Sequence, residues 1–473
     1  MFQYKKITEK TLTLLNTSEK EKLFNEYLGI CSTLTDFKNL TNRLTSKYID
    51  KGYITSKVYL LPQNISLGEI KLHAVEGKVN FIFPKKTYIN NIFLGQKDDF
   101  LNLRDLETSI EMINRLPSNH ATMKLLPSNK TGYTDVHIEN NTTNRINGSI
   151  GINNFGSKKT GKIQGSFSLN FDDMLGIGDQ LSINLNSTDN HFSDENSVGD
   201  SYYYSFPIGH FLNTVSYRKT GYEQLIPTGI TNYKSNGHTK TYEYSLKYKL
   251  FHNQNNSLTL GSGIVHTKSE NFIESALIET STYNLSNINF NVDYLYKTTG
   301  LYTLVSFGFK QGTDWFNTLN PTKLNEKYSL YTVDLSLQKS FEILNYTLNA
   351  HFQQTNDKLF SSNQISIGGP YSVRGYQDEG LSGNSGYYFR NELSKKLEKK
   401  LFDYFVQTYF IALDGGRIKK EEDTNGGTFL GNTFGVKLTK NNFEAMFYYS
   451  SPMYKEDVSI ANNFFGYTFN YRF

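Results

Sequence analysis

The segment FFGYTFNYRF, residues 464–473, alternates between two kinds of side chain from Phe465 to its end. One set of alternate positions is aromatic, namely Phe465, Tyr467, Phe469, Tyr471 and Phe473. The other set is small, polar or charged, namely Gly466, Thr468, Asn470 and Arg472. Because successive side chains of a β-strand point to opposite faces, this segment predicts a strand with one aromatic face and one polar face.

The same alternation recurs from Arg145 to the last residue. It is clear in RINGSIGINN (145–154), DQLSINLNST (179–188) and NINFNVDYLY (287–296). A β-sandwich would have shorter strands, whereas segments of about ten alternating residues are typical of outer-membrane β-barrels. We therefore expect an antiparallel transmembrane barrel of about sixteen strands over residues 145–473, with an aromatic face toward lipid and a polar lumen.

The connections between these strands support a barrel, because short and long ones alternate as periplasmic turns and surface loops do. Short turns are expected near residues 172–178, 208–210, 251–255, 297–299, 340–344, 397–402 and 439–441. Long loops are expected near residues 189–199, 221–236, 269–279, 312–325, 356–385, 415–427 and 451–462. The first strand then starts on the periplasmic side, so residues before it belong to the periplasm.

Composition agrees with this fold and excludes several functions. The chain has 34 tyrosines and 34 phenylalanines, and its mean hydropathy of −0.50 does not exclude a barrel, in which only alternate residues face lipid. A single cysteine, Cys31, excludes an internal disulfide, and a net charge of +4 is too small to indicate nucleic-acid binding. The N-terminal MFQYKKITEK lacks the apolar core of a signal peptide, so we expect a mature or shortened start.

No motif indicates catalysis, a metal or a cofactor, and we do not expect an enzyme. The nine histidines are scattered without metal-ligand spacing. GSKKTGK (156–162) matches the start of a phosphate-binding loop, but Ile163 stands where a serine or threonine should reach magnesium. It also joins two alternating strands, so it reads as a polar hairpin loop.

Residues 1–141 differ from the rest because they contain segments with the apolar spacing of helices. They predict two small α+β modules, at 1–77 and 78–141. Phe37, Leu40, Leu44 and Tyr48 fall on one face of a helix that Ser32, Thr33 or Thr35 can cap and Gly52 can end. A second helix carries Leu106, Ile110 and Ile113, with Asn102 as its cap and Pro117 beyond its end. Strands are expected at 53–60, 69–75, 79–83, 88–93, 121–127 and 134–139.

The glycine-rich stretch GGPYSVRGYQDEG (368–380) lies in the long loop 356–385, after about the eleventh strand. Two strands later, Asp414 has the lumen-facing parity of Thr408 and Ala412. A loop of this length can fold into the lumen, where Arg374 could form a bidentate pair with Asp414. Alternatively, Asp414 and Gly415 form a hairpin turn and Arg374 is a solvated loop charge.

These residues also carry a resemblance to a known family. Val373, Arg374, Gly375 and Tyr376 resemble the sixth-loop signature of the POTRA-barrel superfamily of outer-membrane assembly and secretion proteins. The LDGG stretch with Asp414 and Gly416 resembles that superfamily's motif on the thirteenth strand, although Ala412 replaces the usual aromatic. Residues 52–79 and 113–119 are similar to the POTRA modules of two-partner secretion transporters of the haemolysin secretion/activation type (ShlB/FhaC/HecB), and residues 153–183 to their first barrel hairpin.

The resemblance implies an outer-membrane transporter of a Gram-negative bacterium with periplasmic POTRA domains. It would take one large secreted polypeptide, such as a haemolysin, adhesin or contact-dependent toxin, across the membrane unfolded and without ATP. Residues 373–376 would anchor the loop on Asp414 and Gly416. Family members usually begin with a signal peptide and a plug helix. Outer-membrane lipid is the other expected partner, and we expect a monomer. The alternatives are an outer-membrane assembly factor of the same superfamily or a passive porin, which would lack the front modules.

Overall fold

The computed structural model describes residues 2–3, 6–64, 68–188, 195–229, 231–322, 324–401, 404–422, 424–456 and 463–473. The chain divides into two units, which are described separately below. The first contains residues 1–143 with 175–178 and 207–210, and the second contains the rest of the chain from residue 144. Among the helices of the described ranges, none is both long and apolar enough to cross a membrane.

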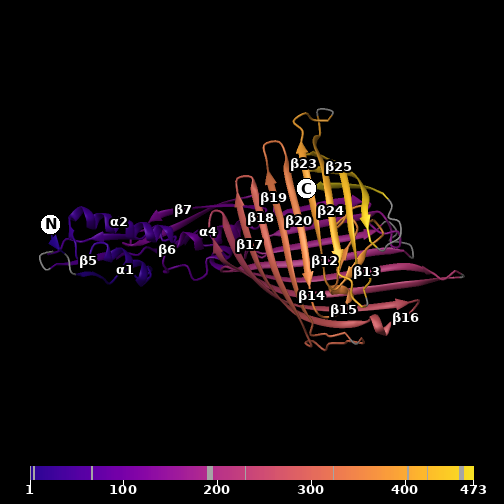
Figure 1. Ribbon diagram of the computed structural model, residues 1–473. Coiled ribbons are helices and arrows are strands. Elements are labelled where there is room, and N and C mark those ends of the chain that lie inside the picture. The colour runs from indigo at the N-terminus through magenta and orange to yellow at the C-terminus, as the bar shows by residue number, and fades with distance from the viewer. Residues whose placement is uncertain are drawn as a thin grey trace. The chain divides into compact units, whose positions relative to one another are not determined.

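The second unit is a closed antiparallel β-barrel, which in the described part of the chain has sixteen strands (Figure 1). Each strand pairs with its neighbours in sequence, and the last strand pairs with the first to close the barrel. The strands are β9 (Ile146–Asn153), β10 (Gln164–Asp172), β11 (Gln180–Thr188), β12 (Asn196–Ile208), β13 (Phe211–Pro227), β14 (Asn232–His252), β15 (Asn256–Ile273), β17 (Tyr283–Thr298), β18 (Leu301–Thr313), β19 (Ser329–Ser340), β20 (Asn345–Gln354), β23 (Gly386–Lys396), β24 (Val406–Ile418), β25 (Gly427–Lys440), β26 (Phe443–Lys455) and β27 (Phe464–Arg472). A two-residue strand, β16 (Ala276–Leu277), adds a short pairing to β15.

The barrel wall has the two faces that the alternation predicted. On β24, Ile411 is 61% exposed on the outer face, whereas its neighbours Phe410 and Ala412 are buried on the inner face. On β27, Phe465 and Tyr471 are exposed outside, and Gly466 and Thr468 are buried inside. The predicted barrel, with apolar and aromatic side chains on its outer face, is therefore confirmed.

Several connections differ from their predicted bounds. The loops expected near 221–236 and 269–279 are largely strand, since β13, β14 and β15 run for 17, 21 and 18 residues. A strand needs only about 9–11 residues to cross the hydrocarbon. The long strands therefore continue beyond the membrane, because their ladder still satisfies the backbone groups there. Residues 189–194 and 457–462 of two other predicted loops lie outside the described residues.

The first unit begins with a module of two helices and a three-stranded sheet. Its elements are β1 (Phe2–Gln3), β2 (Lys6–Glu9), α1 (Thr17–Asn25), β3 (Cys31–Ser32), α2 (Leu34–Asp50), β4 (Lys57–Leu60) and β5 (Glu69–Val75). The sheet order is β2-β5-β4, and β1 pairs only with β3. The predicted stripe on α2 is buried in the core, and Thr33 caps the helix by accepting from the Asp36 N–H.

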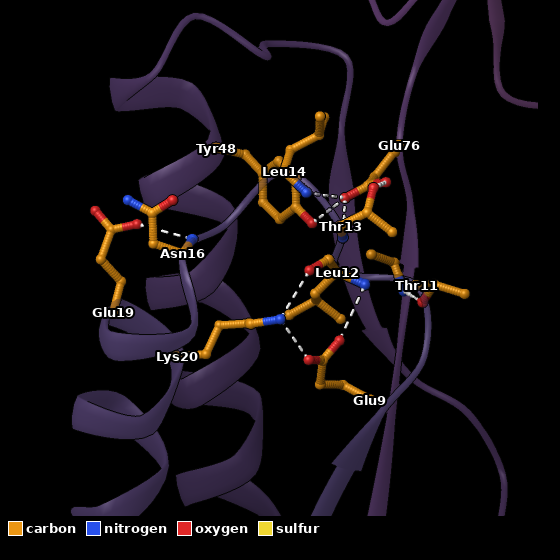
Figure 2. Close-up of polar contacts among 11 residues, drawn as sticks. Glu9, Thr11, Leu12, Thr13, Leu14, Asn16, Glu19, Lys20, Tyr48 and Glu76 are labelled. Carbon is orange, nitrogen blue, oxygen red and sulfur yellow. Dashed lines mark hydrogen bonds and ion pairs between the residues drawn. The ribbon is translucent and has the colours of Figure 1, made fainter.

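The carboxylate of Glu76 holds the connection between β2 and α1 in this module (Figure 2). Glu76 Oε1 accepts from the N–H groups of Thr13 (2.6 Å) and Leu14 (2.9 Å) and from the Tyr48 hydroxyl (2.6 Å). Burial and the Glu76 carboxylate together raise the pKa of the Tyr48 hydroxyl above its usual range, so it remains a donor. Lys20 stabilises the same connection by donating a hydrogen bond to Glu9.

The second module has the sheet order β6-β8-β7, with two helices. Its elements are β6 (Lys78–Phe83), α3 (Thr87–Ile92), α4 (Leu103–Asn114), β7 (Asn119–Pro127) and β8 (Tyr133–Thr142). The strand predicted at 88–93 is wrong, because these residues form α3. Tyr88, Ile89 and Ile92 bury one face of the helix, and a segment of only six residues is too short for its spacing to distinguish a helix from a strand. Of the strand predicted at 53–60, only 57–60 is strand.

The two faces of β27 lead to a prediction about insertion. An arginine at Phe469 would face lipid and should cost about 2–4 kcal/mol near mid-membrane. The same charge at Asn470 would face the lumen and should be tolerated. Insertion is measured as the heat-resistant folded fraction in outer membranes.

Phe469→Arg should lower that fraction strongly, with Asn470→Arg as the matched control. Equal folded fractions for the two variants would contradict the assignment of the faces.

Candidate functional site: a loop anchored in the barrel lumen

The loop between β20 and β23 contains its own small hairpin. A short 3-10 helix, η2 (Ser361–Asn363), precedes β21 (Ile365–Ile367), which pairs with β22 (Leu381–Gly383). The glycine-rich stretch 368–380 forms the connection between β21 and β22. Gly368 has φ +111°, and a Cβ there would lie 2.3 Å from the Glu379 carbonyl oxygen, so this position requires glycine.

Arg374 of this stretch forms a two-point ion pair with Asp414 of β24. Arg374 Nε lies 2.6 Å from Asp414 Oδ2, and Nη2 lies 3.0 Å from Oδ1. The Arg374 backbone N–H also donates to Oδ2, at 3.3 Å. Arg374 is 5% exposed and Asp414 is 0% exposed. The pair is therefore shielded from water. A charge-assisted bidentate contact is strong in such a buried place.

Two further charges from β23 surround this pair. Arg374 Nη1 donates to Glu392 Oε2 at 3.0 Å, so its guanidinium is shared between two carboxylates. Arg390 lies directly across from Asp414 in the β23–β24 ladder. Two cations and two anions thus meet at one place on the lumen wall, and no net charge is buried there.

Aromatic packing holds the residues on either side of Arg374. Val373 and Tyr376 are completely buried in a cluster with Ile367, Ile418 and Phe429. The Tyr376 ring stacks on Phe429, with ring centroids 4.1 Å apart and planes 4° apart. Its hydroxyl donates to the carbonyl oxygens of Leu430 and Tyr454. This end of the loop is therefore bound to β25 and β26 as well as to β24.

Small residues on the wall make room for the loop. A Cβ at Gly431 of β25 would lie 2.0 Å from the Arg374 carbonyl oxygen. A Cβ at Gly416 of β24 would lie 3.1 Å from the Ile367 side chain. Gly375 has φ +99°, and a Cβ there would meet the Ser451 backbone of β26 at 2.8 Å. Close backbone approach thus explains glycine at positions 431 and 375, and at position 416 glycine leaves room for the Ile367 side chain.

The tip of the loop contacts the connection between β9 and β10. Gln377 Nε2 donates to the carbonyl oxygens of Phe155 (3.1 Å) and Gly156 (3.0 Å). The Lys158 N–H donates to Asp378 Oδ1 at 2.8 Å. The stretch that resembled a phosphate-binding loop is therefore a hairpin connection that binds the lumen loop. One loop thus joins β23–β26 to the first hairpin of the barrel.

Comparisons with known proteins agree with this geometry. Residues 132–438 match the family model of the haemolysin secretion/activation protein ShlB/FhaC/HecB. The chain belongs to this family. Residues 2–77 match the ShlB-type POTRA domain, and residues 68–127 match a second POTRA model.

Individual relatives cover most of the chain. It is 27% identical over 459 residues to the outer membrane transporter CdiB of Escherichia coli, covering 94% of this chain and 78% of that protein. It is 25% identical over 407 residues to the hemolysin transporter protein ShlB of Serratia marcescens, covering 84% and 72%. The solved structure of CdiB from Escherichia coli superposes with a TM-score of 0.90 at 26% identity, covering 100% of this chain and 90% of that one.

This ShlB/FhaC/HecB protein is an outer-membrane transporter of the two-partner secretion type. Its barrel lies in the outer membrane, and its two N-terminal POTRA modules lie in the periplasm. The first strand, β9, starts on the periplasmic side, and successive strands alternate in direction. The loops after β9 and β20 therefore lie on the outer side of the membrane.

Sequence reasoning missed four residues of the site in this ShlB/FhaC/HecB protein, namely Arg390, Glu392, Phe429 and Gly431. Glu392 and Arg390 lie on the same, lumen-facing side of β23. The alternation along the strand could have predicted this, and with it the position of Glu392 beside Ala412. Phe429 and Gly431 carried no such signal, because the loop reaches β25 only through the folded barrel. Asp414 lies within β24 and not at a turn, so the alternative of a hairpin at Asp414 and Gly415 is wrong.

The buried pair leads to a prediction about secretion. Removing either Arg374 or Asp414 leaves an uncompensated buried charge, which costs roughly 3–5 kcal/mol when the pair is fully buried. Arg374→Ala and Asp414→Ala should each impair secretion at matched barrel levels. The double variant should add little, because both changes remove one contact.

Arg374→Lys is the conservative control, and it should restore secretion only in part since an ammonium lacks the planar fork. Strictly additive defects in the double variant would show that the two residues act separately.

Proposed function

We propose that this transporter exports one large polypeptide, which its POTRA modules bind in the periplasm and its barrel conducts unfolded to the cell surface. The observation that carries the proposal is the combination in one chain of two POTRA modules and a barrel with a loop packed in its lumen. The cargo would be a haemolysin, an adhesin or a contact-dependent toxin, and the first of these agrees with the names of two relatives, which are hemolysin transporters. No ATP is needed in this account, and the protein is not an enzyme.

The lumen supports passage of a polypeptide chain. A cavity of about 820 Å³ lies between the loop tip and the β9–β10 connection. A second cavity, of about 660 Å³, is lined by polar and charged side chains that include Lys247, Asn291, Asp293 and Lys310. Such walls can exchange hydrogen bonds with an extended backbone without holding any one sequence.

The edge of the second POTRA sheet supports binding by strand addition. Asn114 of α4 bonds both backbone groups of Ala121, with Oδ1 accepting from its N–H at 2.6 Å and Nδ2 donating to its carbonyl at 2.9 Å. The backbone groups of Ala121 therefore point away from β8. By alternation, those of Met123 and Leu125 point the same way. We assign this edge of β7 to the incoming polypeptide.

The anchored loop is proposed to set the state of the channel. Val373, Gly375 and Tyr376 fix the loop by packing, and Arg374 fixes it through Asp414, with Gly416 leaving room for β21. The proposed domains are 1–77 and 78–141 for the two POTRA modules and 145–473 for the barrel with loop 356–385. Outer-membrane lipid is the second partner, and the proposed transporter acts as a monomer.

The first experiment removes the modules. Deleting residues 1–140 should leave a heat-resistant barrel, because its backbone ladder closes on itself, but secretion of the partner should be lost. Secretion is measured at equal barrel levels in the outer membrane. Normal export by the truncated barrel would rule out a capture role for the modules.

A second experiment tests the proposed edge. Leu125→Pro removes one outward N–H but none of the bonds to β8, and proline is tolerated on edge strands. We expect a folded module that no longer binds or secretes the partner. Leu125→Ala keeps the N–H and is the matched control, with secretion close to wild type. Equal secretion by both variants would exclude strand addition at this edge.

A further inference from the structure

The outer wall of the barrel carries an unbroken row of aromatic rings across four strands. Tyr202 of β12 stacks on Tyr217 of β13 at 6.2 Å, and Tyr217 lies 5.1 Å from Tyr242 of β14. Tyr242 is 6.3 Å from the ring of His266 on β15. The last three residues face one another in the strand register. The row is therefore a feature of the lipid-facing surface at one level of the wall.

The next strand would interrupt this row, but a loop residue continues it. His266 pairs with Ser286 of β17, which is only 2% exposed although its parity places it on the outer wall. The turn 315–318, which follows β18, covers it. Ser286 Oγ donates to the Trp315 carbonyl at 3.0 Å. The Phe316 ring then lies 5.5 Å from His266 and continues the aromatic row.

The turn that presents Phe316 is held in an unfavourable backbone conformation. Phe316 and Asn317 have φ of +59° and +55°, a region that bulky residues seldom adopt. Asn284 of β17 donates to both of their carbonyl oxygens. Directly before them, Trp315 is the one tryptophan of the chain and is 45% exposed. β18 spans 13 residues, so the turn lies where the strand leaves the hydrocarbon, the level at which tryptophan concentrates.

The row borders an apolar groove of about 590 Å³ on the outer wall. Its lining includes Tyr204, Val215, Tyr244, Ile264 and Phe316. Val215 and Tyr244 are exposed and belong to the same lipid-facing surface as the row. The groove is thus continuous with the membrane-facing wall, and a hydrocarbon chain fits it chemically.

Three lysines lie immediately above this groove, on the side of the outer leaflet. Lys219, Lys240 and Lys268 each follow the row by two residues along β13, β14 and β15 toward the cell surface. They face one another directly, with Lys219 opposite Lys240 and Lys240 opposite Lys268. Like charges directly opposite on neighbouring strands are destabilising. A bound anion would remove that repulsion.

Acidic residues only partly offset these charges. Lys268 pairs with Glu270 at 2.9 Å, and Glu270 is shared with His238 at 2.8 Å. Among the residues that the structure describes, Lys219 and Lys240 have no ion-pair partner. A second outer cavity of about 620 Å³ opens beside these two lysines and His238. Two more carboxylates share this surface, namely Asp200 of β12 and Glu223, which lines the same cavity and pairs with Lys234 at 3.4 Å. Lysines still outnumber carboxylates above the apolar groove, and the cavity has space for a headgroup.

We propose that this wall binds an outer-leaflet lipid with a phosphate-bearing headgroup. Its acyl chain lies in the groove beside Phe316, and its phosphate is bound by Lys219, Lys240 and Lys268. Each lysine near an anionic lipid contributes on the order of fivefold in affinity. The site is independent of which polypeptide the barrel exports.

The single tryptophan allows a direct test, because its emission reports only the rim of this groove. The purified protein is reconstituted in phosphatidylcholine vesicles that contain brominated phosphatidic acid or, separately, brominated phosphatidylcholine. Bromine quenches only tryptophan that it contacts. We expect phosphatidic acid to quench more effectively at equal fraction, by about fivefold or more since each lysine contributes about that factor, and unlabelled lipid A to reverse this quenching.

The variant Lys219→Gln/Lys240→Gln/Lys268→Gln should lose the preference for the phosphate lipid while keeping a heat-resistant barrel. The charge-matched control replaces the lumen-facing Lys247, Lys310 and Lys437 with glutamine and should keep the preference. High salt should weaken the preference of the unchanged protein, which tests the charges without a substitution. Equal quenching by the two brominated lipids in the unchanged protein would overturn the proposal, as would a preference that survives the triple substitution.

Discussion

A chain that crosses a hydrocarbon layer as strands must pair every backbone N–H and C=O within itself, and this constraint shapes the whole barrel. It requires the last strand to meet the first. That closure is made by only five residue pairs between β27 and β9, whereas all 17 residues of β13 pair with β14. Reciprocal bonds between the backbones of Gly148 and Phe473, each of 3.0 Å, extend the closure. The closing seam is therefore shorter than the two ladders beside it, β9–β10 and β26–β27, which have eight pairs each.

Closure makes a lumen, and the lumen makes it possible to bury a charged loop. An arginine on a surface loop would gain little from an exposed carboxylate. Inside the barrel, Arg374 meets Asp414 and Glu392 away from water, and the stacked ring of Tyr376 holds the loop on the other side. The loop also binds the β9–β10 connection through Gln377 and Asp378. It thus ties the later strands to the first hairpin across the seam, so its position and the closure of the barrel are physically linked.

The outer wall is under a different constraint, because its side chains must suit first the hydrocarbon and then the headgroup region of the membrane. Apolar and aromatic side chains suit the hydrocarbon, and cations suit the headgroups just above it. The sequence of Tyr242 followed by Lys240 toward the cell surface repeats this order within one strand. The turn at Trp315 adds to the wall by covering polar Ser286, whose hydroxyl also lies 3.0 Å from Nδ1 of His266. The side chains of the outer wall are therefore constrained by the membrane, whereas those of the inner wall around Arg374 are constrained by the loop packed against them.

Much of this architecture follows from the sequence by itself. The period of two along FFGYTFNYRF and its counterparts determines strands with two faces, and the alternation of short and long connections determines a barrel. The stripe of Phe37, Leu40, Leu44 and Tyr48 likewise determines a helix, since 3.6 residues per turn bring these positions together. Parity placed Asp414 on the lumen wall, and the glycine-rich loop suggested Arg374 as its partner. Local period fails where runs are short, as at residues 88–93, which form α3 and not a strand. What only the tertiary structure decided is which surfaces meet across the barrel: Phe429 under Tyr376, Gly431 against the Arg374 carbonyl, and Phe316 beside His266. These contacts join residues that are distant in sequence, and no periodic pattern records them, because they depend on how far the barrel curves and how deep the loop enters it.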